Sequence, residues 1–159
     1  MLFISIGLSQ KGFETTGDYV QIALPSTAFI THVYSGEQKD FIYSFLTTMA
    51  VTHSIKFALN RQRPKGGKYS FPSGHSAASF TGAYYIHRKY GSYYGATAFL
   101  AAGYVAWSRV KSRNHYITDV VAGASIGLIT SYLFDSKRFL IQSKTFEEGT
   151  KGIKISFAF

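Results

Sequence analysis

The sequence of 159 residues contains no cysteine, only three prolines, and neither an internal repeat nor a low-complexity segment. A zinc-type metal site is not expected, because cysteine is absent and the five histidines lack a zinc-like spacing with a third ligand. We therefore expect no metal and no cofactor. The length indicates one domain, which is large enough to bury a hydrophobic core.

Acidic side chains are scarce, particularly in the middle of the chain. The formal net charge is +9, and between Phe41 and Phe134 the only acidic residue is Asp119. Basic residues gather in two short stretches, 56–68 and 109–113. Such a distribution focuses a positive potential that attracts anions. A nucleic-acid-binding surface is the alternative interpretation, but these cations cluster around histidines instead of forming an even stripe with stacking aromatics. No nucleic-acid partner is expected.

Three short motifs follow one another in the central part of the chain. They are K-x6-R-P beginning at Lys56, P-S-G-H ending at His75, and S-R-x5-H-x3-D ending at Asp119. A phosphoryl group in transfer spreads negative charge over its oxygens, so its catalysis depends mostly on cationic clamping and positioning. Arginine can pair two oxygens at once, and lysine adds a point charge. The motifs therefore predict a site that binds a phosphate and attacks its phosphorus.

The spacing of the motif residues suggests individual roles. Ser73 and Gly74 are predicted to begin a helix, whose free backbone N–H groups favour an anion, and glycine allows the backbone to approach the ligand closely. His115 and Asp119 are one helical turn apart, so the carboxylate can fix the tautomer of the imidazole and leave its other nitrogen free to attack. His75, beside the anion-binding turn, can protonate the departing oxygen.

The three motifs resemble the signature of the type 2 phosphatidic acid phosphatase (PAP2) superfamily, which includes lipid phosphatases, bacterial non-specific acid phosphatases and vanadium haloperoxidases. The resemblance spans residues 17–136, and no motif position departs from the pattern. It implies metal-independent hydrolysis through a phosphohistidine, with His115 as nucleophile, Asp119 as its orienting carboxylate and His75 as general acid. It also implies that five residues hold the phosphoryl oxygens: Lys56, Arg63, Ser73, Gly74 and Arg109. Arg61 and Arg113 are expected to be solvated charges at the rim.

The most favoured function is therefore a phosphatase that acts on a phosphomonoester or terminal diphosphate, with a phosphorylated lipid as the first choice of substrate. A non-specific acid phosphatase acting on small soluble esters is the close alternative. Two alternatives come from other classes: a vanadate-dependent haloperoxidase, whose chains are normally much longer, and a catalytically dead anion- or lipid-binding protein. The motifs recognise the phosphate and do not indicate what carries it, and the sequence does not indicate an oligomeric state.

The expected fold is all-α, an antiparallel bundle of about five core helices. Small and aromatic residues alternate in the helical segments, which allows close helix–helix contact. Threading these segments up and down places the connections 60–72 and 109–115 at the same end, so the motifs converge there. We expect one helical phosphatase domain over residues 1–138 and a C-terminal tail over 139–159. The predicted helices are 17–34, 41–59, 73–88, 93–108 and 116–134.

The tail alternates with a period of two from Gly152 to Phe159, which is typical of a strand. One strand cannot close a barrel, so we expect a docking segment or a loosely ordered tail.

The helical segments differ in how well they fit a membrane span. Segments 93–108 and 116–134 are apolar enough to span a bilayer but short, and the mean hydropathy of the chain is close to zero. The lipid-phosphatase resemblance implies six spanning helices, whereas five segments are found and residues 1–16 are too short and polar for another. Those residues also lack the features of a signal peptide. We expect a cell-envelope protein that is embedded in or associated with a membrane, with its site facing the periplasm; a soluble periplasmic protein is the alternative.

Overall fold

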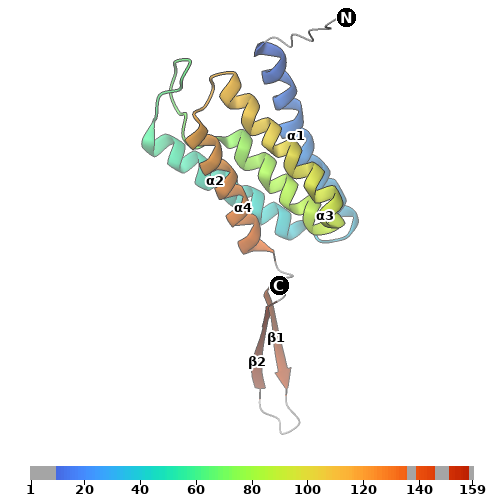
Figure 1. Ribbon diagram of the computed structural model, residues 1–159. Helices are drawn as coiled ribbons and strands as arrows, with labels where there is room; N and C mark the ends of the chain where they lie inside the picture. The colour runs from blue at the N-terminus through green and yellow to red at the C-terminus, as the bar shows by residue number, and fades with distance from the viewer. Residues whose placement is uncertain (1–9, 136–138, 146–150, 158–159) are drawn as a thin grey trace, which may run out of the picture.

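The computed structural model describes residues 10–135, 139–145 and 151–157. Within these residues the chain forms an antiparallel helical bundle followed by two strands, as Figure 1 shows. The predicted all-α bundle is confirmed. The elements are α1 (Gln10–Tyr34), α2 (Gln38–Leu59), α3 (Gly74–Lys111), α4 (Ile117–Phe134), β1 (Phe139–Thr145) and β2 (Lys151–Phe157).

The described residues contain four helices, where five were predicted, because α3 combines the two segments expected at 73–88 and 93–108. Gly91 interrupts α3 with a non-helical conformation (φ 79°, ψ −172°), which glycine adopts without the steric penalty of a Cβ atom. The two arms pack against each other, since the rings of Phe80 and Phe99 lie 6.2 Å apart. The arms therefore act as separate bundle members, and both ends of α3 reach the same end of the molecule. The first helix also begins earlier than predicted, at Gln10 instead of residue 17.

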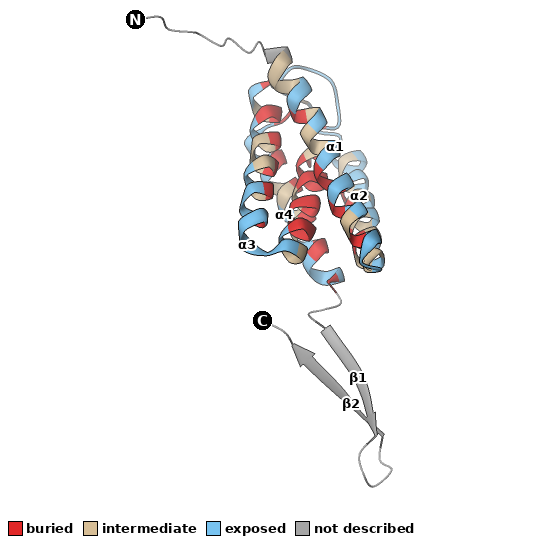
Figure 2. Cartoon of the chain, turned by 90° about the vertical axis from the view of Figure 1, so that its right-hand side faces the viewer, coloured by how far each residue is buried: buried red, intermediate tan, exposed pale blue. Residues whose placement is uncertain are grey.

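Buried side chains line the inward faces of the four helices (Figure 2). The apolar core joins Leu24 and Ala28 of α1 to Phe41 of α2 and Tyr85 of α3. The close contact of α4 with the start of α3 depends on Gly123, because a Cβ atom there would lie 2.2 Å from the carbonyl oxygen of Ser73. This approach positions α4 beside the second motif.

Small hydroxyl side chains fill the space where α2, α3 and α4 meet. Thr48 Oγ1 is 3.3 Å from Thr81 Oγ1 and also bonds to Thr130 Oγ1, and Ser44 Oγ donates to Ser131 Oγ at 3.2 Å. All five side chains are buried. These pairs satisfy one another inside the bundle and hold three helices together without large apolar groups.

The two strands form an antiparallel hairpin in which Phe139 pairs with Phe157 and Thr145 pairs with Lys151. β2 coincides with the alternating segment of the tail, and β1 supplies a partner strand that the sequence pattern did not indicate. The final two residues, including Phe159, lie outside the described residues.

Candidate active site

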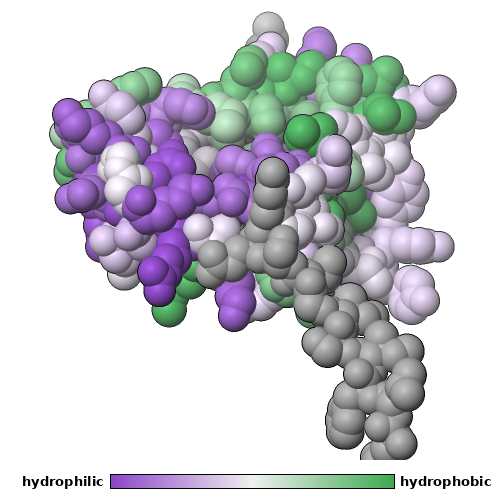
Figure 3. All heavy atoms as spheres, turned by 90° about the horizontal axis from the view of Figure 1, so that it is seen from above, coloured by the Kyte–Doolittle hydropathy of each residue, from purple (hydrophilic) through white to green (hydrophobic). Residues whose placement is uncertain are grey.

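The connections α2–α3 and α3–α4 meet at one end of the bundle, as the up-and-down threading predicted. Lys65 N donates to the carbonyl oxygen of Arg113 at 3.1 Å, and Ser73 N donates to that of Asp119 at 2.9 Å. Figure 3 looks down on this end and shows a broad hydrophilic surface on the side where the α2–α3 connection lies, with hydrophobic side chains along another margin. The three motifs are therefore brought together by backbone contacts between distant segments.

His115 lies in the connection before α4, and Asp119 lies in the first turn of α4. Both are buried, with side chains 3% and 0% exposed, and His115 Nδ1 is 3.5 Å from Asp119 Oδ2. That distance is longer than an ordinary N–H···O hydrogen bond, and Nδ1 has no hydrogen-bond partner among the described residues. The pair that the four-residue spacing predicted is thus adjacent, and the imidazole presents Nδ1 towards the carboxylate.

Asp119 is held by more groups than the sequence indicated. Oδ2 accepts from Ser70 Oγ at 2.5 Å and from Tyr116 N at 2.9 Å, while Oδ1 accepts from Arg61 Nη1 at 2.9 Å. Oδ2 therefore accepts two hydrogen bonds already, and it is also the carboxylate oxygen that lies 3.5 Å from His115 Nδ1. The bond to Tyr116 N also satisfies a free N–H group at the start of α4.

Arg61 was expected to be a solvated rim charge, and the structure corrects this expectation. Its side chain is 42% exposed but forms an ion pair with fully buried Asp119. Its guanidinium lies 4.4 Å from the ring centre of Tyr116, a cation–π arrangement. The sequence did indicate that Asp119 would pair with a cation, because it is the only carboxylate in a basic region. The spacing of the motifs did not indicate which of the basic residues would be its partner.

The imidazole of His115 is uncharged at neutral pH. Burial, followed by the positive charges of Lys56 and Arg63, lowers its pKa from the ordinary 6.5 to about 4, against the opposing effects of Asp119 and the Ser70 carbonyl group. An uncharged imidazole has a free nitrogen lone pair, which a nucleophile requires.

A polar pocket of about 330 Å³ opens beside His115. It brings together both motif histidines and both motif arginines. It also contains two carboxylates from α1 that sequence reasoning missed. The lining residues are Glu14, Asp18, Arg63, His75, Arg109, Asn114 and His115.

Arg109 enters this pocket with a side chain that is only 3% exposed. Its guanidinium donates through Nη1 to Asp18 Oδ1 at 2.8 Å, through Nη2 to the carbonyl oxygen of Glu14 at 2.5 Å, and through Nε to Ser108 Oγ at 3.2 Å. These three bonds fix the plane of the guanidinium, and among the described residues they leave two of its five N–H groups for a ligand.

The two cations of the first motif are attached to their own connection. Lys56 Nζ donates to the carbonyl oxygen of Tyr69 at 2.9 Å, and Arg63 Nε donates to that of Lys68 at 3.1 Å. Lys56 lies near enough to influence the charge of His115, as does Arg63. Both therefore belong to the electrostatic surroundings of the candidate nucleophile.

Ser73 and Gly74 begin α3 as predicted. Ser73 is buried, and its Oγ accepts from Ser76 N at 3.4 Å as the helix N-cap. A Cβ atom on Gly74 would meet only Thr52 Cγ2, at 3.9 Å. Packing within the protein therefore does not demand glycine at position 74.

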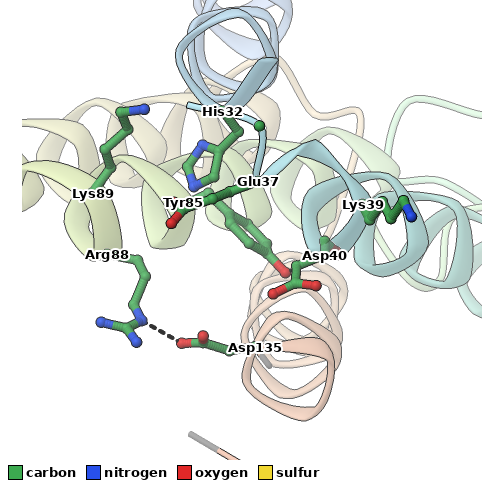
Figure 4. Close-up of a pocket in the computed structure, with 9 residues that line it drawn as sticks. His32, Glu37, Lys39, Asp40, Tyr85, Arg88, Lys89 and Asp135 are labelled. Carbon is green, nitrogen blue, oxygen red and sulfur yellow. Dashed lines mark hydrogen bonds and ion pairs between the residues drawn. The ribbon is translucent and has the colours of Figure 1, made fainter. Parts of the chain in front are cut away.

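A second polar pocket, of about 250 Å³, lies among the connections at the opposite end of the bundle (Figure 4). Here Arg88 Nε is 2.6 Å from Asp135 Oδ2, and Tyr85 OH donates to the carbonyl oxygen of Asp40. No motif residue lines this pocket. The candidate active site is consequently the pocket that contains both His75 and His115.

Comparison with known proteins shows similarity to two bacterial lipid A phosphatases. The chain is 34% identical over 82 residues to the lipid A 1-phosphatase of Porphyromonas gingivalis, a match that covers 49% of this chain and 18% of that protein. It is 32% identical over 83 residues to the lipid A 4'-phosphatase of the same bacterium, covering 48% of this chain and 35% of that one. The chain therefore spans well under half the length of these two relatives.

Solved structures share the fold. The crystal structure of Aquifex aeolicus LpxE superposes with a TM-score of 0.59 at 20% identity, covering 84% of this chain and 98% of that one. A transmembrane PAP2 type phosphatidylglycerolphosphate phosphatase from Bacillus subtilis gives a TM-score of 0.61 at 23% identity, covering 80% and 74%. The model of the PAP2 superfamily matches residues 39–139, which include every motif residue identified from the sequence. The chain belongs to the PAP2 superfamily.

Proposed function

We propose that this protein is a phosphatase that hydrolyses a phosphomonoester or terminal diphosphate of a lipid through a phosphohistidine at His115. The observation that carries this proposal is one pocket lined by His75, His115, Arg63 and Arg109, with buried Asp119 behind His115. The membership in the PAP2 superfamily and the two lipid A phosphatase relatives support a lipid substrate.

In the first step, His115 Nε2 attacks phosphorus while Nδ1 faces Asp119. The P–N bond forms as the bond from phosphorus to the leaving oxygen breaks, and His75 gives that oxygen its proton. Asp119 stabilises the positive charge that develops on the His115 ring, since its carboxylate is 3.5 Å from Nδ1. Arg61 Nη1 donates to the other oxygen of this carboxylate at 2.9 Å and holds it in place.

Five groups bind the phosphoryl oxygens in this proposal: Lys56, Arg63, Ser73, Gly74 and Arg109. Arginine and lysine supply charge, and the start of α3 supplies backbone N–H groups that point out of the helix. Gly74 fits this role because packing within the protein leaves room for a side chain there, so the close approach would be that of the substrate.

In the second step, His75 accepts a proton from water, and the water oxygen attacks phosphorus. The P–N bond breaks, which releases inorganic phosphate and restores the uncharged imidazole of His115. Each histidine thus returns to its starting protonation state.

We also propose that the helical domain, residues 1–138, is embedded in a membrane with α4 as a spanning helix. Among the described residues, α4 is the one helix long and apolar enough to cross a bilayer. Its outward face carries a stripe of apolar side chains, Ile117, Val121, Ile129 and Leu133, which are 58–67% exposed. Such a face requires an apolar partner or a lipid environment.

The interior supports the same proposal. Many fully buried side chains are small and polar, such as Ser44, Thr48 and Thr52, whereas larger apolar side chains such as Leu46 and Phe57 are more than 60% exposed on the same helix. Small polar residues between helices and large apolar residues outside are typical of bundles packed in lipid.

For orientation, we propose that the site end faces the periplasm. The opposite end carries Lys39, Arg88 and Lys89, and basic residues favour the cytoplasmic side. The site end is basic too, but its cations are left out of this comparison because binding of the phosphate accounts for them. Because the chain contains no cysteine, single variants Lys68→Cys and Lys39→Cys can be labelled in intact cells with a membrane-impermeant maleimide. Labelling of position 68 but not of position 39 is expected, and the reverse would overturn the orientation.

The proposed activity is tested by phosphate release from the detergent-purified protein in excess EDTA, with His115→Ala as the control. The substrates are a short-chain lipid phosphate and a small soluble ester. Release that depends on His115 and favours the lipid phosphate is expected. Preference for the soluble ester would instead identify a non-specific acid phosphatase, and equal release by His115→Ala would exclude the phosphohistidine mechanism.

A further inference from the structure

We propose that Asp18, on α1, is a positioning residue for the general acid, and that it joins His75 and Arg109 into one hydrogen-bonded unit. This inference rests on the proposed function. Asp18 Oδ1 is 3.0 Å from His75 Nε2 and 2.8 Å from Arg109 Nη1. None of the three motifs contains Asp18, so its position depends on how α1 packs against the rest of the site.

The packing of α1 against the end of α3 is unusually close at Gly17. A Cβ atom on Gly17 would lie 2.1 Å from Ser108 Oγ and 2.7 Å from Arg109 Nη2. Arg109 Nη2 also donates to the carbonyl oxygen of Glu14, one turn earlier on α1. The close approach at Gly17 and the hydrogen bond to Glu14 thus hold the backbone of α1 against the third motif. The next side chain after Gly17, that of Asp18, consequently reaches His75.

The charges around His75 explain why a carboxylate is needed there. Arg109 and Arg63 lie near its ring, and burial together with the charge of Arg109 lowers the pKa of His75, while Asp18 opposes this effect. Glu14 is the other carboxylate of the pocket, but its Oε1 accepts from Asn114 Nδ2 at 2.7 Å and from Lys65 Nζ at 3.3 Å.

Asp18 is therefore the acidic group bonded to His75. A general acid must hold a proton until the leaving oxygen takes it, and a neighbouring carboxylate stabilises that protonated form.

The contact also selects the atom that transfers the proton. Asp18 accepts from Nε2–H of His75, which assigns Nδ1 to the substrate. In the first step Nδ1–H gives its proton to the leaving oxygen, and the neutral ring keeps Nε2–H bonded to Asp18. In the second step Nδ1 takes a proton from the attacking water. One fixed tautomer thus serves as acid and then as base.

The kinetic test compares Asp18→Asn with Asp40→Asn, which makes the same chemical change at the opposite end of the bundle. Turnover is measured against pH with an alkyl phosphate and with p-nitrophenyl phosphate, whose leaving group departs readily without a proton. We expect Asp18→Asn to lower kcat on the alkyl ester by about 10- to 100-fold, part of the general-acid contribution. We expect a much smaller loss on p-nitrophenyl phosphate and a shift of the alkaline limb to lower pH. Asp40→Asn should match the unmodified protein.

A second measurement does not depend on turnover. The His75 imidazole is titrated by NMR in the full chain with 15N-labelled histidine, and its signals are assigned by their loss in His75→Gln. We expect the pKa of His75 to be lower in Asp18→Asn than in the unmodified protein and in Asp40→Asn. If the unmodified protein shows no turnover, the proposed function fails while this titration still decides the role of Asp18.

Three outcomes would overturn the inference. An unchanged pKa of His75 would show that Asp18 does not stabilise its protonated form. Equal losses of kcat on both esters with an unmoved pH profile would indicate a structural role alone. A gain in activity, or tighter inhibition by inorganic phosphate, would show that the Asp18 carboxylate competes with the substrate for Arg109.

Discussion

The guanidinium of Arg61 lies 2.9 Å from one oxygen of Asp119, and Asp119 in turn presents its other oxygen to His115 at 3.5 Å. The side chain of Asp119 has no exposed surface, whereas the side chain of Arg61 is 42% exposed. A cation at the edge of the site therefore neutralises a carboxylate in its interior. Removing the cation would leave a buried charge without its partner, which is costlier than losing an exposed ion pair.

Replacing Arg61 by glutamine should lower kcat by roughly 10-fold, because Asp119 would lose the bond that fixes Oδ1 and would stabilise the His115 imidazolium less well. Steady-state kinetics on the lipid phosphate measure this effect. Arg113→Gln is the matched control, since Arg113 is an exposed arginine of the neighbouring connection. Equal activities of the two variants would return Arg61 to the role of a solvated rim charge.

The depressed pKa of His115 predicts how activity depends on pH. The uncharged imidazole is the nucleophile, so kcat/KM should stay high as pH falls through 6.5 and decline only near the folded-state value of about 4. A profile of kcat/KM between pH 3.5 and 8 measures this limb. An acid limb centred near 6.5 instead would mean that His115 titrates as an exposed histidine does.

The same shift predicts a stability effect of definite sign. Between pH 4 and 6.5 the unfolded chain binds a proton at His115 that the folded chain does not, so stability should fall as pH decreases through this range. The contribution is fully present above 6.5. Urea unfolding of the detergent-solubilised protein at pH 7 and pH 5 measures it, and His115→Gln should lose less stability than the unmodified protein over that interval.

Much of the site was predictable because its chemistry is concentrated in short motifs. The four-residue spacing of His115 and Asp119 predicted that the two side chains are neighbours. The alternating direction of successive helices predicted that the connections 60–72 and 109–115 lie at the same end of the bundle. Asp18 could not be found in this way. Its place in the site depends on the close approach at Gly17, which is a tertiary contact between distant parts of the chain.

Two other differences have local causes. The sequence divided α3 into two helices because its pattern weakens around residues 89–92, whereas the chain continues through a single non-helical residue, Gly91. β1 has no marked alternation and is defined by its pairing with β2, and pairing between strands is a property that a single segment does not reveal.

The contact between α4 and the start of α3 can be tested with a pair of glycines. In Gly123→Ala the new Cβ would lie 2.2 Å from the carbonyl oxygen of Ser73, so the helices must separate, at a cost of about 1–3 kcal/mol. Gly103→Ala, in α3, would meet nothing within 4 Å and should stabilise the helix by about 0.5–1 kcal/mol. The free energy of unfolding, measured in detergent, should therefore decrease in Gly123→Ala and increase in Gly103→Ala. Similar shifts would mean that α4 adjusts freely against α3.

The division into a helical domain and a tail predicts that deletion of residues 139–159 leaves catalysis intact. Every residue assigned to the site lies between Glu14 and Asp119, and the described residues that line the pocket beside His115 all belong to this region. The deleted chain should therefore keep kcat and KM on the short-chain lipid phosphate within about twofold, since no phosphate-binding group is removed. The comparison is made in detergent at equal protein concentration, with thermal unfolding recorded for both chains. A large fall in kcat without a change in thermal unfolding would mean that the hairpin reaches the substrate, and the proposed boundary at residue 138 would then be wrong.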